Sequence, residues 1–166
     1  YQGLHNMELA SPVYGEMVYE SHFGPTDYSF NIGKAHIVTM KNINYVGGKS
    51  YLTSLTGQQL DWLKKDLSYL PEGSLVILNM HAPSWNRISP DGNIRNAAQL
   101  KEVLKNYNVH VFSGHTHFFQ NNEVSPVLYE HNIGAACGGW WTGWVNQCGA
   151  PNGYMVVDVD GNDLKW

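Results

Sequence analysis

The stretch Ser74-Leu75-Val76-Ile77-Leu78-Asn79 is a continuous apolar run, and it decides the fold class of this chain. Such a run is typical of a strand that is covered on both faces. A helix is expected over residues 96–107, with an inward face formed by Leu100, Val103, Leu104 and Tyr107. A second short apolar strand follows over residues 110–113. The order strand, helix, strand predicts a βαβ unit, so the two strands should be parallel neighbours in an α/β fold.

The flanking segments predict further elements of the same domain. Thr56-Gly57-Gln58-Gln59 has the pattern of a helix capping box, and Pro71 ends a helix whose apolar face comprises Leu60, Leu63, Leu67 and Leu70. Residues 29–32 and 35–40 predict a hairpin, and residues 123–131 and 154–159 predict antiparallel strands. The chain shows no internal repeat and no linker, so one domain is expected over residues 1–166.

Composition excludes two classes of partner. The 166 residues are 43% hydrophobic and 14% charged, with a formal net charge of −4. There is no cluster of Lys and Arg that would release counterions from nucleic acid, so no nucleic-acid-binding surface is expected. No apolar run approaches the roughly 20 residues that span a bilayer, so no membrane segment is expected either.

Both apolar strands are followed by histidines. The first leads into Asn79-Met80-His81-Ala82-Pro83 and the second into Gly114-His115-Thr116-His117. The carboxyl ends of parallel strands meet at one edge of a sheet, so the three imidazoles should gather there. His115 and His117 are expected to project to the same side of an extended segment. A lone histidine at a strand end is usually an ordinary hydrogen-bonding residue, but three at one edge favour a site for Zn, Fe, Mn or Ni.

These motifs resemble those of a known family. Ser113-Gly-His-Thr-His117 resembles the terminal GHxH motif of the calcineurin-like metallophosphoesterases, and Asn79-Met-His-Ala-Pro83 resembles the single-histidine motif that precedes it. The aromatic hairpin and the helix after it are also similar, through residues 23–30, 35–42 and 58–63. Residues 131–141 and 151–154 resemble the secreted bacterial branch of the family. The similarity covers nearly the whole chain.

The resemblance implies a fold and a chemistry. The fold would be an α-β-β-α sandwich with a mixed sheet and flanking helices, and the activity would be hydrolysis of small phosphate esters, as a phosphomonoesterase or phosphodiesterase. His81 and His115 would bind one of two divalent ions and His117 the other. The metals could be Mn, Fe, Zn, Ca or Mg.

The family's upstream motifs are absent from this sequence. They are an Asp-x-His, a Gly-Asp with a bridging aspartate, and a Gly-Asn-His followed by Asp or Glu. The chain is therefore expected to be the C-terminal portion of one catalytic domain, without a complete dinuclear site and weak or inactive alone. The sheet would then have an exposed edge that favours a homodimer.

Several residues have two interpretations. Trp140, Trp141 and Trp144 would either fill the core or, with Tyr154, contact the substrate beside the metals. Asn79 and Asn86 could orient ligands or bind phosphate, whereas Asp91, Arg95 and Glu123 should be solvated charges. Cys137 and Cys148 could form a disulfide or remain free thiols. A disulfide would suit a periplasmic or extracellular protein.

Two other functions compete with the phosphoesterase. One is a mononuclear zinc hydrolase in which His81, His115 and His117 bind a single ion with an open water position. The other is a non-enzymatic carbohydrate-binding module with a tryptophan platform. Metal stoichiometry would separate the first from a dinuclear enzyme, and ligand binding that survives chelation would identify the second.

Overall fold

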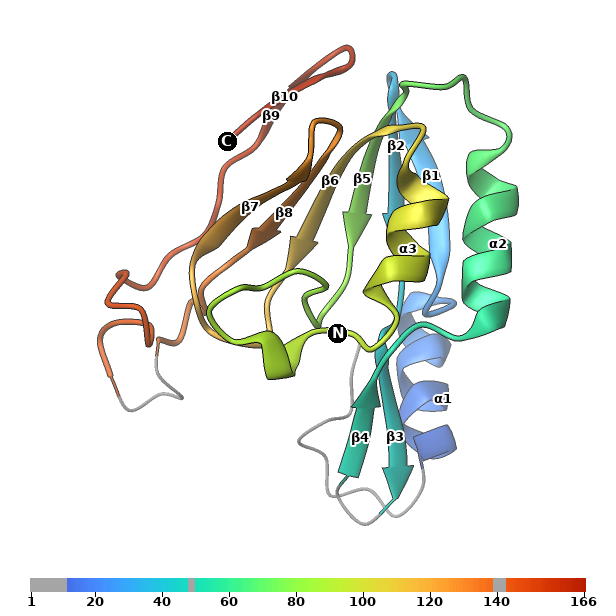
Figure 1. Cartoon of the computed structure of the whole chain (residues 1–166). Helices are drawn as coiled ribbons and strands as arrows, with labels where there is room; N and C mark the ends of the chain where they lie inside the picture. Colours follow the sequence, from blue (N-terminus) through green and yellow to red (C-terminus); the bar gives the residue numbers. More distant parts are fainter. Residues whose placement is uncertain (1–11, 48–49, 139–142) are drawn as a thin grey trace.

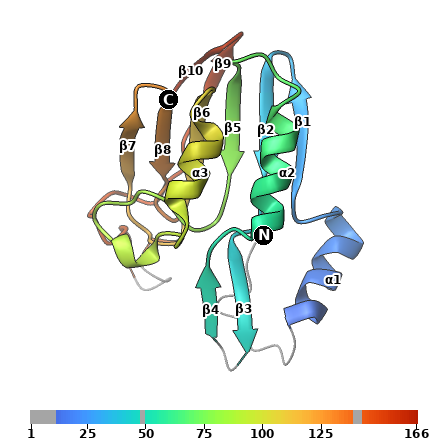
Figure 2. The ribbon, with the colours of Figure 1, turned by 45° about the vertical axis from the view of Figure 1, so that its right-hand side comes forward.

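The computed structural model describes residues 12–47, 50–138 and 143–166. In the described part, one six-stranded mixed sheet has the order β1-β2-β5-β6-β8-β7. Strands β2, β5, β6 and β8 are parallel, while β1 and β7 are antiparallel edge strands. Helices α2 and α3 cover one face of this sheet (Figure 1, Figure 2). The α/β class is confirmed, and the arrangement is consistent with a fragment of the expected calcineurin-like fold.

The predicted βαβ unit is present. It consists of β5 (Leu75–Asn79), α3 (Ala97–Leu104) and β6 (Asn108–Ser113). The two strands are parallel neighbours, with Ile77 opposite His110. The helix ends three residues before the predicted boundary, and β6 begins two residues before it. The sequence pattern thus located the unit correctly and its boundaries approximately.

Helix α2 (Gly57–Leu67) begins at the predicted capping box. The backbone N–H of Gln59 donates to Thr56 Oγ1 at 3.2 Å, and the N–H of Thr56 donates to Gln59 Oε1 at 2.8 Å. Leu63 and Leu67 are fully buried against the sheet, together with Leu100 and Leu104 of α3. This helix layer and the strands beneath it form the main core.

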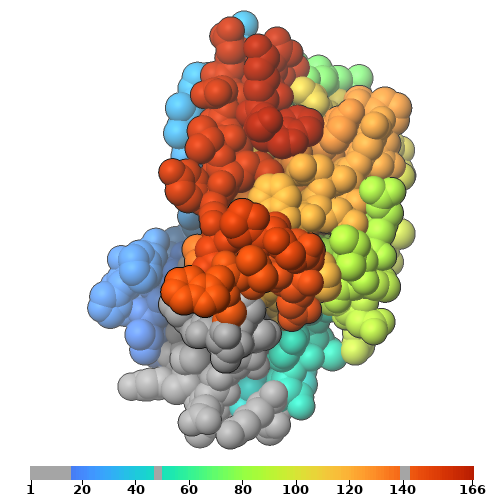
Figure 3. Space-filling model, turned by 90° about the vertical axis from the view of Figure 1, so that its left-hand side faces the viewer, coloured from blue at the N-terminus to red at the C-terminus, as the bar shows by residue number. Residues whose placement is uncertain are grey.

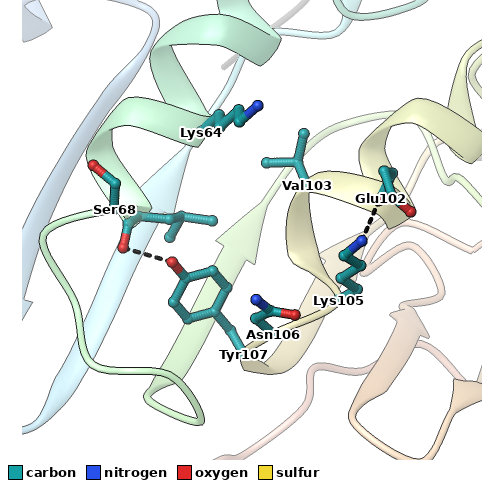
Figure 4. Close-up of a pocket in the computed structure, with 8 residues that line it drawn as sticks. Lys64, Ser68, Glu102, Val103, Lys105, Asn106 and Tyr107 are labelled. Carbon is teal, nitrogen blue, oxygen red and sulfur yellow. Dashed lines mark hydrogen bonds and ion pairs between the residues drawn. The ribbon is translucent and has the colours of Figure 1, made fainter.

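The two helices also meet at their C-terminal ends. There the hydroxyl of Tyr107 donates to the Leu67 carbonyl at 2.8 Å (Figure 4). Burial raises the pKa of the Tyr107 hydroxyl, and the carboxylate of Glu72 adds to this shift. A cavity of about 310 Å³ between the helix ends is rimmed by Lys64 and by the Lys105–Glu102 ion pair. These contacts fix the spacing of α2 and α3 on the side remote from the carboxyl ends of the strands.

The edges of the sheet are hairpins. Strands β1 (Tyr28–Ile32) and β2 (Ala35–Thr39) form the predicted one, which turns at Gly33 with a φ of 59°. At the other edge, antiparallel strands were predicted over residues 123–131, and the structure has a hairpin there that turns at residues 126–127 between β7 (Gln120–Ser125) and β8 (Leu128–Asn132). Pro126 lacks the N–H needed to continue the ladder.

The remaining elements lie around this sheet. A hairpin of β3 (Ile43–Gly47) and β4 (Ser50–Thr53) lies beyond the carboxyl ends of the parallel strands, beside α1 (Pro12–Phe23) (Figure 1). A one-turn 3₁₀ helix spans Pro90–Gly92. The predicted strand over residues 154–159 is wrong in extent: β9 (Asp158–Asp160) pairs with β10 (Asp163–Lys165) around the turn at Gly161. No helix among the described residues is long and apolar enough to span a bilayer.

The face of the sheet opposite the helices is partly covered by the C-terminal hairpin. Leu164 of β10 packs against Ala35 and Leu75 on that face. Trp166 contacts the ring of His131, with ring centroids 4.5 Å apart. Among the described residues, no second large sheet lies on this face, so the structure shows the helix layer and one main sheet of the expected sandwich.

Candidate metal centre

His81 and His115 meet at the carboxyl ends of β5 and β6. The parallel ladder continues past both strands, because the Met80 N–H donates to the Phe112 carbonyl at 3.0 Å and the Gly114 N–H donates to the His81 carbonyl at 2.9 Å. His81 Nε2 lies 3.1 Å from His115 Nδ1, and the two rings meet edge to face at 71°. The predicted convergence of these two imidazoles is therefore observed.

The backbone at the GHTH motif is not extended, contrary to expectation. His115 and His117 have φ values of 67° and 56°, in the left-handed region that residues with a Cβ rarely adopt. The Thr116 N–H closes a tight turn onto the Gly114 carbonyl at 2.7 Å. As a result His115 faces His81 and the ring of Tyr51, whereas His117 faces the Gly138 carbonyl.

A hydrogen bond to the backbone helps to orient His117. Its Nδ1 lies 3.1 Å from the carbonyl oxygen of Gly138, which can only accept, so Nδ1 carries the proton. In a neutral imidazole with the proton on Nδ1, the lone pair is on Nε2. A metal-binding histidine commonly donates its other ring N–H to a carbonyl in this way. The Gly138 contact is therefore compatible with metal binding through Nε2 of His117.

The His81–His115 pair also fits a divalent ion. Two imidazole nitrogens about 2.05 Å from a tetrahedral zinc ion would be about 3.3 Å apart, close to the distance between these two atoms. The described residues contain no group of three or more His, Cys, Asp or Glu side chains that could hold a metal. His81, His115 and His117 all belong to the described residues, so as placed they do not form a three-ligand site.

The loop after His81 is held by a buried carboxylate that sequence reasoning missed. Glu130 of β8 is fully buried, and its Oε1 and Oε2 accept the backbone N–H groups of Ser84 and Trp85 at 2.6 and 2.7 Å. The hydroxyl of Ser113 donates to the same carboxylate at 3.2 Å. Burial raises the pKa of Glu130, and these three donors act in the opposite direction. One side chain thereby joins the segment after His81 to the end of β6.

Asn42 holds the same loop from the other side. Its side chain donates to the Ala82 carbonyl at 2.8 Å and accepts the Ala82 N–H at 3.0 Å. Asn42 is fully buried, so both bonds are shielded from water. Because Ala82 directly follows His81, this amide fixes the backbone next to the first histidine.

A third group of polar side chains holds the turn between His115 and His117. The hydroxyl of Thr116 donates to Asn132 Oδ1 at 2.5 Å, and Asn132 Nδ2 donates to the Gly114 carbonyl at 2.6 Å. Asn86, only 1% exposed, donates to the same Asn132 oxygen at 2.7 Å. These bonds stabilise the strained turn. This position of Asn86 is compatible with the expectation that it orients the site. Asn79 instead lies in the sheet and donates to the Val38 carbonyl at 3.4 Å.

The remaining candidate residues are distributed as follows. Trp140 and Trp141 lie outside the described residues. Trp144 is 93% exposed and Tyr154 is 84% exposed, so a core position for Trp144 is wrong. Cys137 and Cys148 are free thiols in the structure: the sulfur of Cys148 accepts the Phe119 N–H at 3.3 Å instead of bonding to Cys137. Asp91, Arg95 and Glu123 are exposed, as expected for solvated charges.

The fold and the site together define a class of protein. It is an α/β protein with imidazoles at the carboxyl ends of two adjacent parallel strands, held by buried amide and carboxylate side chains. Residues 130–166 match a family model described as the C terminal of Calcineurin-like phosphoesterase. This match agrees with the resemblance carried by the sequence motifs, and it covers the last 37 residues, which begin at Glu130 and include Asn132. No curated protein matches the chain.

Proposed function

We propose that this chain is part of a metal-dependent hydrolase of phosphate esters, with His81, His115 and His117 as metal ligands. The observation that carries the proposal is the 3.1 Å approach of His81 Nε2 to His115 Nδ1 beyond two parallel strands. The match of residues 130–166 to a phosphoesterase family supports the reaction class.

In this proposal the histidines of the chain would bind the metal ions, and the polar residues around them would orient the imidazoles. His81 and His115 would share one ion, and His117, fixed by the Gly138 carbonyl, would bind a second. Two bound divalent ions would polarise the phosphoryl group and activate a water molecule for attack. Glu130, Asn42 and Asn132 hold the two loops so that the imidazoles are in place before any ion arrives. Imidazole ligands have little selectivity among Mn, Fe and Zn, so the identity of the metal is left open. A cofactor of two divalent ions is part of the proposal.

Further features of the proposal concern the whole protein. A bridging aspartate and the other upstream motifs would complete the dinuclear site from a preceding segment. A periplasmic or extracellular location and a homodimer formed through an edge strand also remain predictions. A small phosphate ester is the proposed partner.

A zinc titration of the 166-residue chain tests the ligand assignment. Isothermal titration calorimetry should give one site that weakens at least tenfold in His115→Ala and in His81→Ala. The double variant should lose little more than either single variant, because both imidazoles serve the same ion. Hydrolysis of 4-nitrophenyl phosphate and of its bis ester, with added Mn²⁺ or Zn²⁺, would then separate monoesterase from diesterase activity.

His22→Ala is the matched control. This histidine is exposed on α1, where its Nδ1 lies 2.8 Å from the Val18 carbonyl. Its replacement should leave zinc affinity unchanged. Equal zinc affinity in the wild type, His81→Ala and His115→Ala would reject the proposal.

A further inference from the structure

A small pocket lies in the loops that follow the GHTH motif. Its volume is about 290 Å³, and it is lined by Phe119, Gly134 and residues 150–154. The lining side chains include two aromatic rings and a proline but no charged group. Tyr154 is 84% exposed and Phe119 is 41% exposed, so both rings are accessible to a ligand.

One buried amide builds this pocket. Asn146, 3% exposed, accepts the Ala135 N–H at 2.6 Å and donates to the Pro151 carbonyl at 3.2 Å. Its own backbone N–H donates to the Ala150 carbonyl at 2.8 Å. A Cβ at position 134 would lie only 2.9 Å from the Asn146 side chain and would clash with it, so position 134 requires glycine. The two loops that form the pocket are therefore tied together.

The pocket adjoins the candidate metal centre. Phe119 follows His117 by two residues, and the carbonyl that orients His117 belongs to Gly138. A Cβ at Gly138 would lie 2.6 Å from Oδ1 of Asn152, a residue that lines the pocket. The loops of residues 143–154 lie at the same end of the sheet as the carboxyl end of β6 (Figure 1, Figure 2). On the face seen in Figure 3 the C-terminal segment, orange to red, forms the upper and middle part of the surface.

We propose that this pocket binds the ring of the alcohol half of the substrate, so that the enzyme acts on phosphate esters of aryl or similar ring-bearing alcohols. This inference rests on the proposed function. Aromatic side chains bind planar apolar rings by stacking or edge contact. A pocket lined without Lys or Arg offers no cation to a second phosphate group, which favours substrates whose tail on that side is uncharged.

Binding of the ring alone tests the pocket without any metal. Phenol added to the ¹⁵N-labelled chain should shift the amide resonances of Gly134 and Gly153, whereas methyl phosphate should not. Tyr154→Ala should weaken phenol binding about tenfold, since ring contacts of this kind have that magnitude. Tyr154→Phe should retain binding, and Tyr69→Ala is the matched control because Tyr69 is a tyrosine of similar exposure, 73%, at the end of α2.

The ring pocket and the metal-ligand assignment can be rejected independently of each other. If phenol shifts no pocket resonance, or if Tyr154→Ala binds phenol as the wild type does, the ring pocket is rejected while the zinc titration of His81 and His115 stands. With Zn²⁺ present, phenyl phosphate should bind more tightly than phenol, and His115→Ala should remove the difference. Equal affinities for phenol and phenyl phosphate in the zinc-loaded wild type would show that the pocket does not serve the metal centre.

Discussion

Replacing Glu130 with glutamine should destabilise the protein by about 2–4 kcal/mol. The wild-type carboxylate accepts two backbone N–H groups, from Ser84 and Trp85, inside the fold. Hydrogen bonds to a charged group contribute about 1.5–3 kcal/mol each, whereas a neutral one contributes about 1 kcal/mol. The glutamine oxygen can retain one neutral bond, and its amide group leaves the other backbone N–H without an acceptor. Removal of the buried charge offsets part of this loss.

Urea unfolding followed by far-ultraviolet circular dichroism measures this effect. Glu123→Gln, on the exposed side of β7, is the matched control and should change the free energy of unfolding by less than about 0.5 kcal/mol. The zinc affinity of Glu130→Gln should also fall, because the loop after His81 loses an anchor. A Glu130→Gln protein as stable as the wild type would refute the reasoning, since it would mean that the carboxyl group is already neutral in the fold.

Other predictions concern pH, the core and the helix cap. Burial and the adjacent His110 lower the pKa of His131 from 6.5 to about 4. The unfolded chain therefore binds the extra proton more readily, so the free energy of unfolding should decrease as pH falls from 6.5 to about 4; urea titrations across this range should show a smaller slope in His131→Phe. Leu63→Ala removes a fully buried side chain and should cost about 2–5 kcal/mol, against clearly less for the half-buried Leu60→Ala in the same assay. Thr56→Ala should lower the free energy of unfolding by about 1–2 kcal/mol through loss of the capping box, and Thr56→Ser should restore most of it.

Local sequence patterns were sufficient for the elements that position the site. The apolar run of β5, the leucine spacing of α2 and the Thr56–Gln59 box each act over a few residues, and each structure is found where the pattern predicts it. The meeting of His81 and His115 follows from parallel pairing of β5 with β6, a rule that also needs no detailed coordinates.

The supporting residues could not be predicted in this way. Glu130 binds backbone groups 45 and 46 positions away, and Asn42 binds Ala82 40 positions away. An acidic residue or asparagine in a sequence is ordinarily solvated, and only tertiary contacts show which one is buried. The left-handed turn at His115 was also missed, because histidine has no strong preference for that conformation.

The left-handed backbone at His115 and His117 lowers the stability of the fold at residues that are proposed to bind metal. A non-glycine residue in this conformation costs roughly 1–2 kcal/mol, which glycine would not incur. Laboratory selection for heat resistance alone should therefore enrich His115→Gly and His117→Gly, both of which discard an imidazole. Under the proposed function, each histidine would be kept for its imidazole despite this conformational cost, so stability alone would not explain the residue found at either position.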